Sequence, residues 1–487
     1  MFLRQIVDAF LICRYNGRFK LLHPMDANCS LNLSCSPQFA SCMYVRLNKA
    51  DFSLEKLRQK INDNPEFQSG PYKKLQYRLC SKFGFPFWED MSMSGRFNIK
   101  EHIKLFPGIG DKPIADFELM SLLNKCTNSK DSSTNHQQPD WDILILPQVR
   151  MKWSSQNDTG VALIIRMNHS YMDGNSAQSF LRACVIDPEE SDRIPIDYMN
   201  EKGNAPHSFS RKLIHNGRIL LYGPMHIART IFCNKDSIHL YPENFSPSKR
   251  AIMLAVSNFR MANVSMNKIR VAYGIKSRTV ITSAFLSALR ITAERKGFKT
   301  PNYLNVGITH ARGPYSEQKL ENRFSLLVQC LPLSELSLSS LTESERLIEI
   351  NADNEHEVDA MFWLLSLIGL LPRKLFQIFR PHAVKTCLTG TPSMEKLCKI
   401  QNGLLEATIP IPPMVDGFDY ICAYHNYGGM FTVSFVISTT EVIENSTELA
   451  DFVAEFDSYL QNLQKRANNI LIASSTCSFM CNVSEKI

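Results

Sequence analysis

The fold of this chain is decided by residues 161–185, VALIIRMNHSYMDGNSAQSFLRACV. The first seven of them are apolar and largely β-branched, with Arg166 as the one charge, which predicts a buried strand. The pair Asp173-Gly174 is a turn signal. Beyond it, apolar residues recur at helical spacing from Ala177 to Val185. The stretch therefore predicts a strand, a tight turn and a helix.

His169 lies where the predicted strand ends, in the pattern H-x-x-x-D-G. A free imidazole titrates at about 6.5, so a neutral histidine placed there can take up a proton. Asp173 is expected to fix the turn or pair with a cation, and Gly174 to let the chain reverse or a ligand approach. Asn175 or Ser176 is expected to cap the helix. We interpret His169 as a candidate general base; the competing interpretation is a chance match, because the motif is short.

Length and composition indicate a globular protein of two domains. The chain has 487 residues, of which 44% are hydrophobic and 21% charged, and one ordinary core does not extend over that length. We expect halves over 1–186 and 246–487, joined by a crossover over 187–245. The net charge of +7 favours an acidic or phosphorylated ligand, or an anionic membrane surface, and does not by itself imply nucleic acid.

The 14 cysteines are scattered and include no C-x-x-C pair, so the spacing of a zinc site is missing. They are expected to be mostly reduced core thiols of a cytosol-facing protein, and no metal site is predicted.

Two apolar segments, Ala360–Pro372 and Arg211–Phe232, are each either a buried helix or an interfacial helix with basic flanks. The first is too short for the ~20 residues that cross a bilayer.

Short segments along nearly the whole chain match the motifs of one known family in the correct order. They are Pro24-Met25-Asp26-Ala27, Trp88-Glu89-Asp90, Phe97-Asn98-Ile99 with His102-Ile103, Pro139-Asp140-Trp141-Asp142, Leu286–Arg290, Asn322 with Leu331-Pro332, and Tyr424–Gly429. Through them the chain resembles the wax ester synthase/diacylglycerol acyltransferase family. That family belongs to the chloramphenicol acetyltransferase-like superfamily, which also holds the condensation domains.

The signature of the family is H-H-x-x-x-D-G. Here the second histidine, which is catalytic in the family, is kept as His169, and the first is replaced by Asn168. The N-D pair of the family falls near Arg278-Thr279. Its N-V-P-G-P segment falls near Cys387–Thr391, where only the glycine matches.

The resemblance implies an α/β fold of two chloramphenicol acetyltransferase-like halves, each a mixed sheet with helices, with an active-site channel between them. It implies transfer of a fatty acyl group from acyl-CoA, as co-substrate and with no further cofactor, to a lipid alcohol. In that scheme His169 is the base, and Asp173 is a structural member of the site paired with an arginine, for which Arg312 is the candidate. A membrane-associated protein at the endoplasmic reticulum is expected.

Several alternatives stay open from the sequence. The acceptor is a long-chain alcohol, giving a wax ester, or diacylglycerol, giving triacylglycerol. The replaced first histidine and the altered segments also fit a weak or inactive lipid- or acyl-CoA-binding relative. The N-H-x-x-x-x-D pattern of glycerolipid acyltransferases is one residue longer than the pattern here, and Gly174 favours the first family. His425 is expected to have a hairpin or core role.

Overall fold

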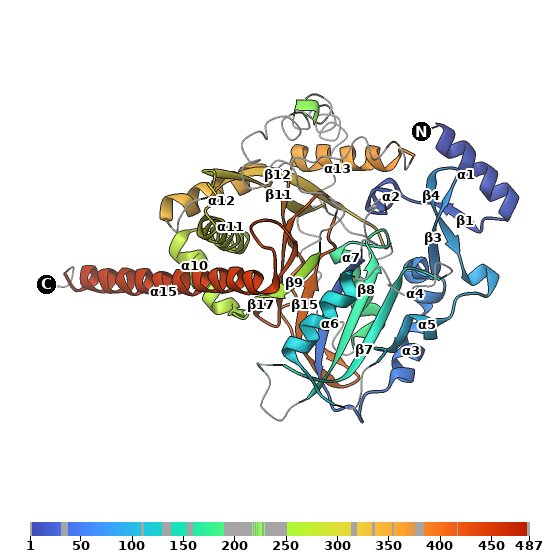
Figure 1. Cartoon of the computed structure of the whole chain (residues 1–487), viewed down its shortest axis with the longest axis horizontal. Helices are drawn as coiled ribbons and strands as arrows, with labels where there is room; N and C mark the ends of the chain where they lie inside the picture. Colours follow the sequence, from blue (N-terminus) through green and yellow to red (C-terminus); the bar gives the residue numbers. More distant parts are fainter. Residues whose placement is uncertain are drawn as a thin grey trace.

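A computed structural model describes most of the chain. The described residues are 2–30, 38–108, 112–128, 138–151, 153, 159–188, 251–312, 319–333, 337–352, 355–372, 375, 384–415 and 417–484, with isolated residues between 217 and 228. They form two seven-stranded sheets and one three-stranded sheet, with helices packed around them (Figure 1). The predicted mixed α/β architecture is confirmed. Most of the segment Arg211–Phe232, and most of the crossover over 187–245, lies outside the described residues.

The first large sheet carries the strand predicted from residues 161–167. Its order is β14-β15-β2-β8-β7-β5, with β6 paired to β7. The strands are β2 (Gln38–Arg46), β5 (Ile103–Leu105), β6 (Ile114–Ala115), β7 (Trp141–Arg150), β8 (Gly160–Asn168), β14 (Lys399–Ile400) and β15 (Gly403–Ile411). Every residue of β8 is buried, as its near-continuous apolar run predicted.

Two strands of this sheet come from the far end of the sequence. β15 pairs antiparallel with β2, so residues of the second half complete the sheet of the first half. The turn before β15 is held by Asp187, whose carboxylate accepts from the backbone N–H of Gln401 at 3.1 Å and of Asn402 at 2.9 Å. The two lobes are therefore interlocked through the backbone.

The second large sheet has the order β10-β17-β16-β13-β11-β12, with β9 on β17. Its strands are β9 (Ile252–Val256), β10 (Met261–Ala262), β11 (Tyr303–Ala311), β12 (Phe324–Pro332), β13 (Thr386–Gly390), β16 (Tyr420–Tyr427) and β17 (Met430–Ser438). The helices packed around it include α10 (Asn263–Tyr273), α11 (Ser277–Arg295), α12 (Leu338–Ala352) and α13 (Glu355–Gly369). The sequence over 266–297 predicts two helices broken near Gly274, and the break is confirmed: this residue ends α10 with a φ of +66°, which favours glycine.

The remaining elements belong to the N-terminal lobe. The three-stranded sheet holds β1 (Phe19–Leu21), β4 (Phe85–Asp90) and β3 (Tyr77–Lys82). The helices are α1 (Phe2–Tyr15), α2 (Pro24–Cys29), α3 (Leu54–Asn62), α4 (Pro65–Gln68), α5 (Ile99–His102), α6 (Asp116–Asn128) and α7 (Gly174–Phe180), with the short turns η1 (Pro71–Gln76), η2 (Ser92–Ser94) and η3 (Leu181–Val185). The sequence predicts helices over 54–62 and 116–124; α3 has the predicted bounds, and α6 runs four residues further.

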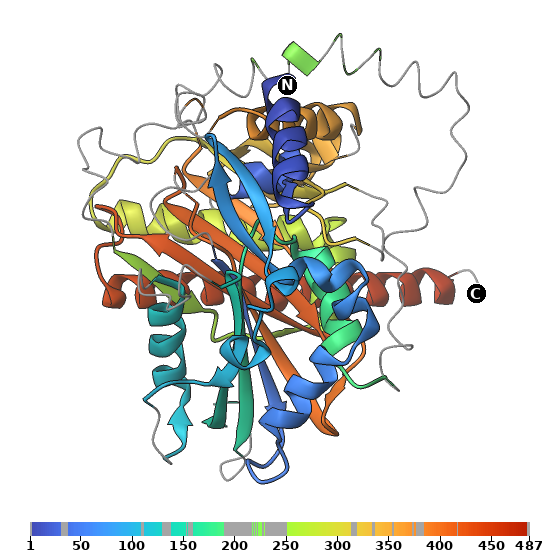
Figure 2. The same cartoon turned by 90° about the vertical axis from the view of Figure 1, so that its right-hand side faces the viewer.

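Apolar residues at steps of three to four predict a final helix over 447–468. The structure has a longer one, α15 (Ser446–Ser484). Its apolar face packs into the core of the second lobe as far as Ala467. Beyond that point the helix projects from the body of the molecule (Figures 1 and 2), and Ile472 is exposed. Within the described part of the chain, no helix is long and apolar enough to span a bilayer.

Candidate active site

The loop after β8 is held by the side chain of Asn168. Its oxygen accepts from the backbone N–H of Ser170 at 3.0 Å and from the Ser170 hydroxyl at 2.8 Å, and its amide donates to Asp140 at 3.0 Å. Asn168 is 4% exposed, so these bonds satisfy a buried amide. The residue at the position of the family's first histidine therefore fixes the turn that presents His169.

His169 lies where the two lobes meet. Its ring has two aromatic neighbours, Phe39 from β2 and Phe324 from β12, with ring centroids 5.4 Å away in both cases. The two strands belong to different sheets. The histidine is half-buried, so it is packed by both lobes and still keeps accessible surface.

One hydrogen-bond chain decides which nitrogen of His169 carries the proton. The Asn322 amide nitrogen lies 2.9 Å from Asp26 Oδ1, which can only accept, and 2.9 Å from the His169 carbonyl. The Asn322 amide oxygen therefore faces His169 Nδ1, at 2.9 Å, and must accept a proton from it. In the neutral ring this leaves the lone pair on Nε2. The network thus assigns His169 the tautomer that a general base at Nε2 requires.

The surroundings also keep the ring neutral. Burial lowers the pKa of His169 below its ordinary 6.5, and this effect outweighs the opposing influence of Asp173, Asn322 and Asp26. A neutral imidazole can accept a proton, whereas an imidazolium cannot. At neutral pH His169 is therefore a neutral imidazole, the form that can accept a proton.

Lys74 ties this network to the loop. From η1, its ammonium lies 2.7 Å from Asp26 Oδ2 and donates to the carbonyls of Tyr171 at 2.7 Å, Leu320 at 3.1 Å and Ser170 at 3.2 Å. It also sits over the Trp88 ring, 5.2 Å from its centroid. The charge of the buried Asp26 is thus compensated beneath the histidine loop. No motif in the sequence pointed to Lys74.

Asp173 caps α7 and joins the two lobes. One carboxylate oxygen accepts from the backbone N–H of Ser176 at 3.0 Å, and the other from the backbone N–H of Arg323 at 2.8 Å. The expected cap at Asn175 or Ser176 was wrong, because the helix begins at Gly174. Asp173 is the better cap here because a single carboxylate satisfies both the helix end and the facing loop.

The expected pairing of Arg312 with Asp173 was wrong. The guanidinium of Arg312 pairs with Asp359 of α13 and lies over the Phe362 ring, 4.4 Å from its centroid. Its backbone N–H bonds the carbonyl of Arg323 at 2.8 Å, so Arg312 reaches the Asp173 region only through the backbone.

Gly174 provides a close approach between the lobes. A Cβ at this position would come 3.3 Å from Thr391 Cγ2, on the segment after β13. The Thr391 hydroxyl lies 2.6 Å from His425 Nδ1, and burial lowers the pKa of His425 to about 4. The glycine is therefore used for packing between lobes, and His425 lies on β16 behind that contact.

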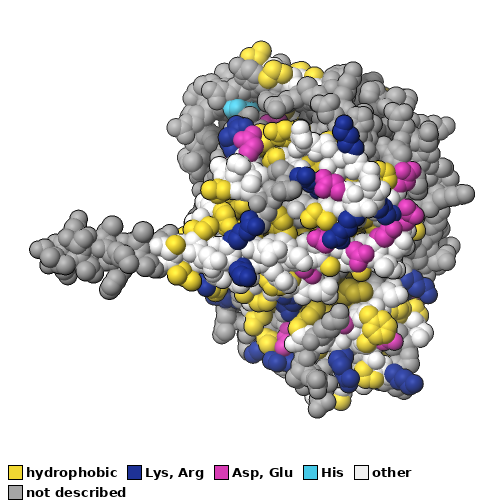
Figure 3. Space-filling model, turned by 60° about the vertical axis from the view of Figure 1, so that its left-hand side comes forward, with side chains coloured by type: hydrophobic (Ala, Val, Ile, Leu, Met, Phe, Trp, Pro, Cys, Tyr) yellow, Lys and Arg dark blue, Asp and Glu magenta, His cyan; other side chains and the backbone are white. Residues whose placement is uncertain are grey.

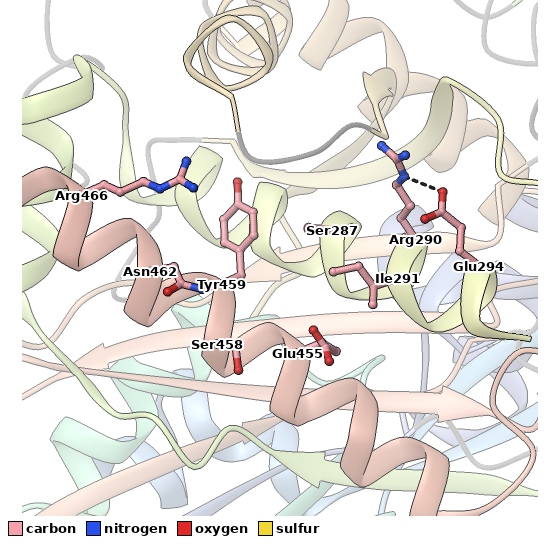
Figure 4. A pocket seen from close by; sticks show the side chains of 9 residues that line it. All are labelled: Ser287, Arg290, Ile291, Glu294, Glu455, Ser458, Tyr459, Asn462 and Arg466. Carbon is pink, nitrogen blue, oxygen red and sulfur yellow. Dashed lines mark hydrogen bonds and ion pairs between the residues drawn. The ribbon is translucent and has the colours of Figure 1, made fainter.

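Two surface cavities lined by described residues lie away from His169. One, of about 320 Å³, lies between α11 and α15, and its lining includes Arg466 and the ion pair of Arg290 with Glu294 (Figure 4). The other, of about 500 Å³, lies between α1 and residues 367–372. Neither cavity includes His169, so the expected channel remains a prediction. Among the described residues, no group of His, Cys, Asp and Glu could hold a metal ion.

Asp173→Ala is expected to lower the free energy of unfolding by about 2–4 kcal/mol, because it removes a helix cap and leaves the N–H of Arg323 without its acceptor. Urea denaturation checks this. Ser53→Ala is the matched control, since Ser53 caps the more exposed helix α3 through the N–H of Lys56; it should cost about 1 kcal/mol. Equal losses in the two variants would contradict the bridging role.

Comparison with known proteins finds relatives only among solved structures. No family model matches the chain, and neither does any curated protein sequence. The wax ester synthase/diacylglycerol acyltransferase from Marinobacter aquaeolei VT8 is 12% identical with a TM-score of 0.56, covering 92% of this chain and 100% of its own. The trichothecene 15-O-acetyltransferase from Fusarium sporotrichioides is 10% identical with a TM-score of 0.59, covering 92% and 96%.

A third similar structure is the starter condensation domain of rhizomide synthetase, solved as a mutant in complex with C8-CoA and Leu-SNAC. It is 11% identical with a TM-score of 0.52, covering 94% of this chain and 96% of its own. At such low identity these likenesses establish the fold alone. The chain has the two-lobed fold of condensation domains and chloramphenicol acetyltransferase-like acyltransferases, as the resemblance implied.

Proposed function

We propose that the protein is an acyltransferase that moves a fatty acyl group from acyl-CoA to the hydroxyl of a lipid alcohol, with His169 as general base. The observation that carries the proposal is the Asp26–Asn322–His169 chain, which leaves Nε2 unprotonated where the two lobes meet. The fold, shared with solved acyltransferases, supports acyl transfer in general. The motif resemblance favours a lipid acceptor.

The chemistry balances with few protein groups. His169 Nε2 takes the proton of the alcohol hydroxyl while the oxygen attacks the thioester carbonyl. The tetrahedral intermediate collapses, the C–S bond breaks, and the imidazolium returns the proton to the thiolate of CoA. A thioester is already activated, so no enzyme nucleophile is needed. Holding both reactants beside the aromatic rings of Phe39 and Phe324 would exclude water and supply proximity.

The direct test uses the purified full chain in detergent with labelled palmitoyl-CoA. Hexadecanol and diacylglycerol are offered as separate acceptors, so that the ester formed identifies the acceptor class. Release of CoA without ester would mean hydrolysis. No ester with either acceptor, from folded protein that binds palmitoyl-CoA, would reject the enzyme proposal for these acceptors.

That outcome would favour the second candidate, a lipid- or acyl-CoA-binding protein. One structural observation supports this candidate: Asn168, at the position of the family's first histidine, is engaged in holding the turn and bonds Asp140 and Ser170. Binding of palmitoyl-CoA without turnover, unchanged in His169→Ala, would distinguish it from the enzyme.

Asn322→Ala is expected to shift His169 toward the Nε2-protonated tautomer, because Nδ1–H loses its acceptor. The nitrogen NMR shifts of Nδ1 and Nε2 of His169 report the tautomer directly, and this measurement does not depend on enzymatic turnover. Turnover should fall by at least about tenfold, with a smaller effect on the KM for palmitoyl-CoA. An unchanged tautomer in the variant would contradict the orienting role of Asn322, whatever the activity.

A further inference from the structure

The first helix buries Leu11 but places several of its other apolar residues on the outside. In α1 the exposed positions include Leu3, Ile6 and Phe10, which are 60%, 48% and 53% exposed, whereas Arg4 is 3% exposed and its guanidinium donates to the carbonyl of Leu22. A surface helix normally buries its apolar stripe and turns its charges to water. The orientation of α1 therefore indicates that its outer face meets something other than bulk water.

The exposed apolar surface continues onto two neighbouring elements. Phe83, at the turn between β3 and β4, is 67% exposed and its ring centroid lies 6.0 Å from that of Phe10. It has a φ of +51°, which is unusual for a bulky residue and holds the ring at the tip. Leu367 of α13 is exposed and lines the cavity of about 500 Å³ together with Leu3.

We call Leu3, Ile6, Phe10, Phe83 and Leu367 the apolar patch. Figures 1 and 2 place α1 near the end of α13 at one edge of the molecule. The face shown in Figure 3, from which the C-terminal helix projects, instead mixes apolar, basic and acidic side chains. Scattered apolar residues of that kind need no explanation, whereas a gathered set does.

The surroundings of the apolar patch carry an excess of positive charge. Residues 2–21 and 77–90, which hold α1 and the three-stranded sheet, contain six basic and three acidic side chains. One of those acids, Glu89, is shared by the guanidinium groups of Arg18, Arg78 and Arg96. Lys82 lies directly beside Phe83 in sequence. An apolar centre with a basic rim matches a surface that is apolar within and anionic at its boundary.

We propose that the apolar patch docks this protein onto an anionic lipid bilayer, with α1 lying in the interface and Phe83 inserted from the hairpin tip. A second copy of the chain is a poorer occupant, because a two-fold contact would bring the basic rims of both copies together. The proposal goes beyond the acyl transfer proposed above and does not depend on His169. Of the two apolar segments for which the sequence left an interfacial helix open, Ala360–Pro372 contributes Leu367 of α13 to the apolar patch.

The test is co-sedimentation of the full chain with vesicles made of equal parts phosphatidylcholine and phosphatidylserine, beside vesicles of phosphatidylcholine alone. Binding to the anionic vesicles is expected, and it should weaken as salt is raised. Leu3→Glu, Phe10→Glu and Phe83→Glu should each weaken the partition coefficient by about tenfold or more. Val271→Glu is the matched control, since Val271 on α10 is 72% exposed and lies outside the apolar patch.

Three outcomes would overturn the proposal. One is folded protein that does not sediment with either vesicle. Another is the same loss of binding in Val271→Glu as in Phe83→Glu. The third is self-association, measured by sedimentation velocity without lipid, that Leu3→Glu abolishes while vesicle binding is unchanged; this would assign the surface to a second copy. Circular dichroism of each variant confirms that a lost signal is not a lost fold.

Discussion

His169→Ala should lower ester formation by about 10²–10⁴-fold, which is the usual contribution of a positioned general base. The variant removes the imidazole between Phe39 and Phe324 and leaves the loop held by Asn168, Lys74 and Asn322. The fold should therefore persist, and binding of palmitoyl-CoA should change little. Initial rates and the affinity for palmitoyl-CoA, measured on the same preparation, separate the two effects.

The control for His169→Ala is rescue by added imidazole, which should restore part of the rate because the variant leaves a space of that size.

The pH dependence gives a second check on the role of His169. Since burial lowers the pKa of His169, kcat/KM should stay level as the pH falls to about 6.5 and decline only below that value. For the same reason the free energy of unfolding should decrease as the pH falls below about 6.5. Full activity in the variant would reject His169 as the base.

Lys74→Met is expected to lower the free energy of unfolding by about 3–5 kcal/mol. The substitution keeps the length of the side chain but leaves the carboxylate of Asp26, 3% exposed, without its cation. It also takes a donor from the carbonyls of Ser170, Tyr171 and Leu320. Activity should fall as well, because Asp26 anchors Asn322 and through it the histidine tautomer. Denaturation in urea gives the size of the loss.

Lys73→Met is the matched control. Lys73 precedes Lys74 in the sequence, but its half-exposed ammonium lies 3.7 Å from Asp90. The Asp90 carboxylate keeps the donors of Ser92 and Met93 when that ammonium is removed, so Lys73→Met should cost only about 1 kcal/mol. Adding Asp26→Asn to Lys74→Met should recover part of the stability, because it removes the uncompensated charge. A loss in Lys74→Met no greater than in Lys73→Met would show that the buried pair is not needed.

Local sequence patterns predicted the elements that local physics determines. The apolar run of β8, the bounds of α3 and the break at Gly274 all follow from residues close together in the chain, and the structure has them as expected. The motif around His169 was also recognised, because its six residues, 169–174, are consecutive in the chain. The catalytic roles given to His169 and Asp173 remain predictions.

The residues that hold the His169 loop in place, Asp26, Lys74 and Asn322, could not be predicted as a group, because they come from distant parts of the chain. Asp26 and Asn322 stood in recognised motifs, but nothing in either segment says that their side chains meet. Lys74 lies in a short turn with no signal of its own. Arg312 was assigned to the wrong carboxylate for the same reason: Asp359 is brought beside it only by the packing of α13 on β12. Three-dimensional contacts, and not spacing, decide these partners.

The pairing of β15 with β2 also has a consequence during synthesis. When a ribosome has made only the first four hundred residues, the edge of β2 has no neighbour on that side, and its backbone N–H and C=O groups remain open to any other strand. The sheet beneath His169 can close only after residues 403–411 emerge, so the first lobe cannot finish folding until most of the second has been synthesised. During that interval the nascent chain can aggregate through the open edge of β2. The first lobe, expressed without residues 403–411, would keep this open edge.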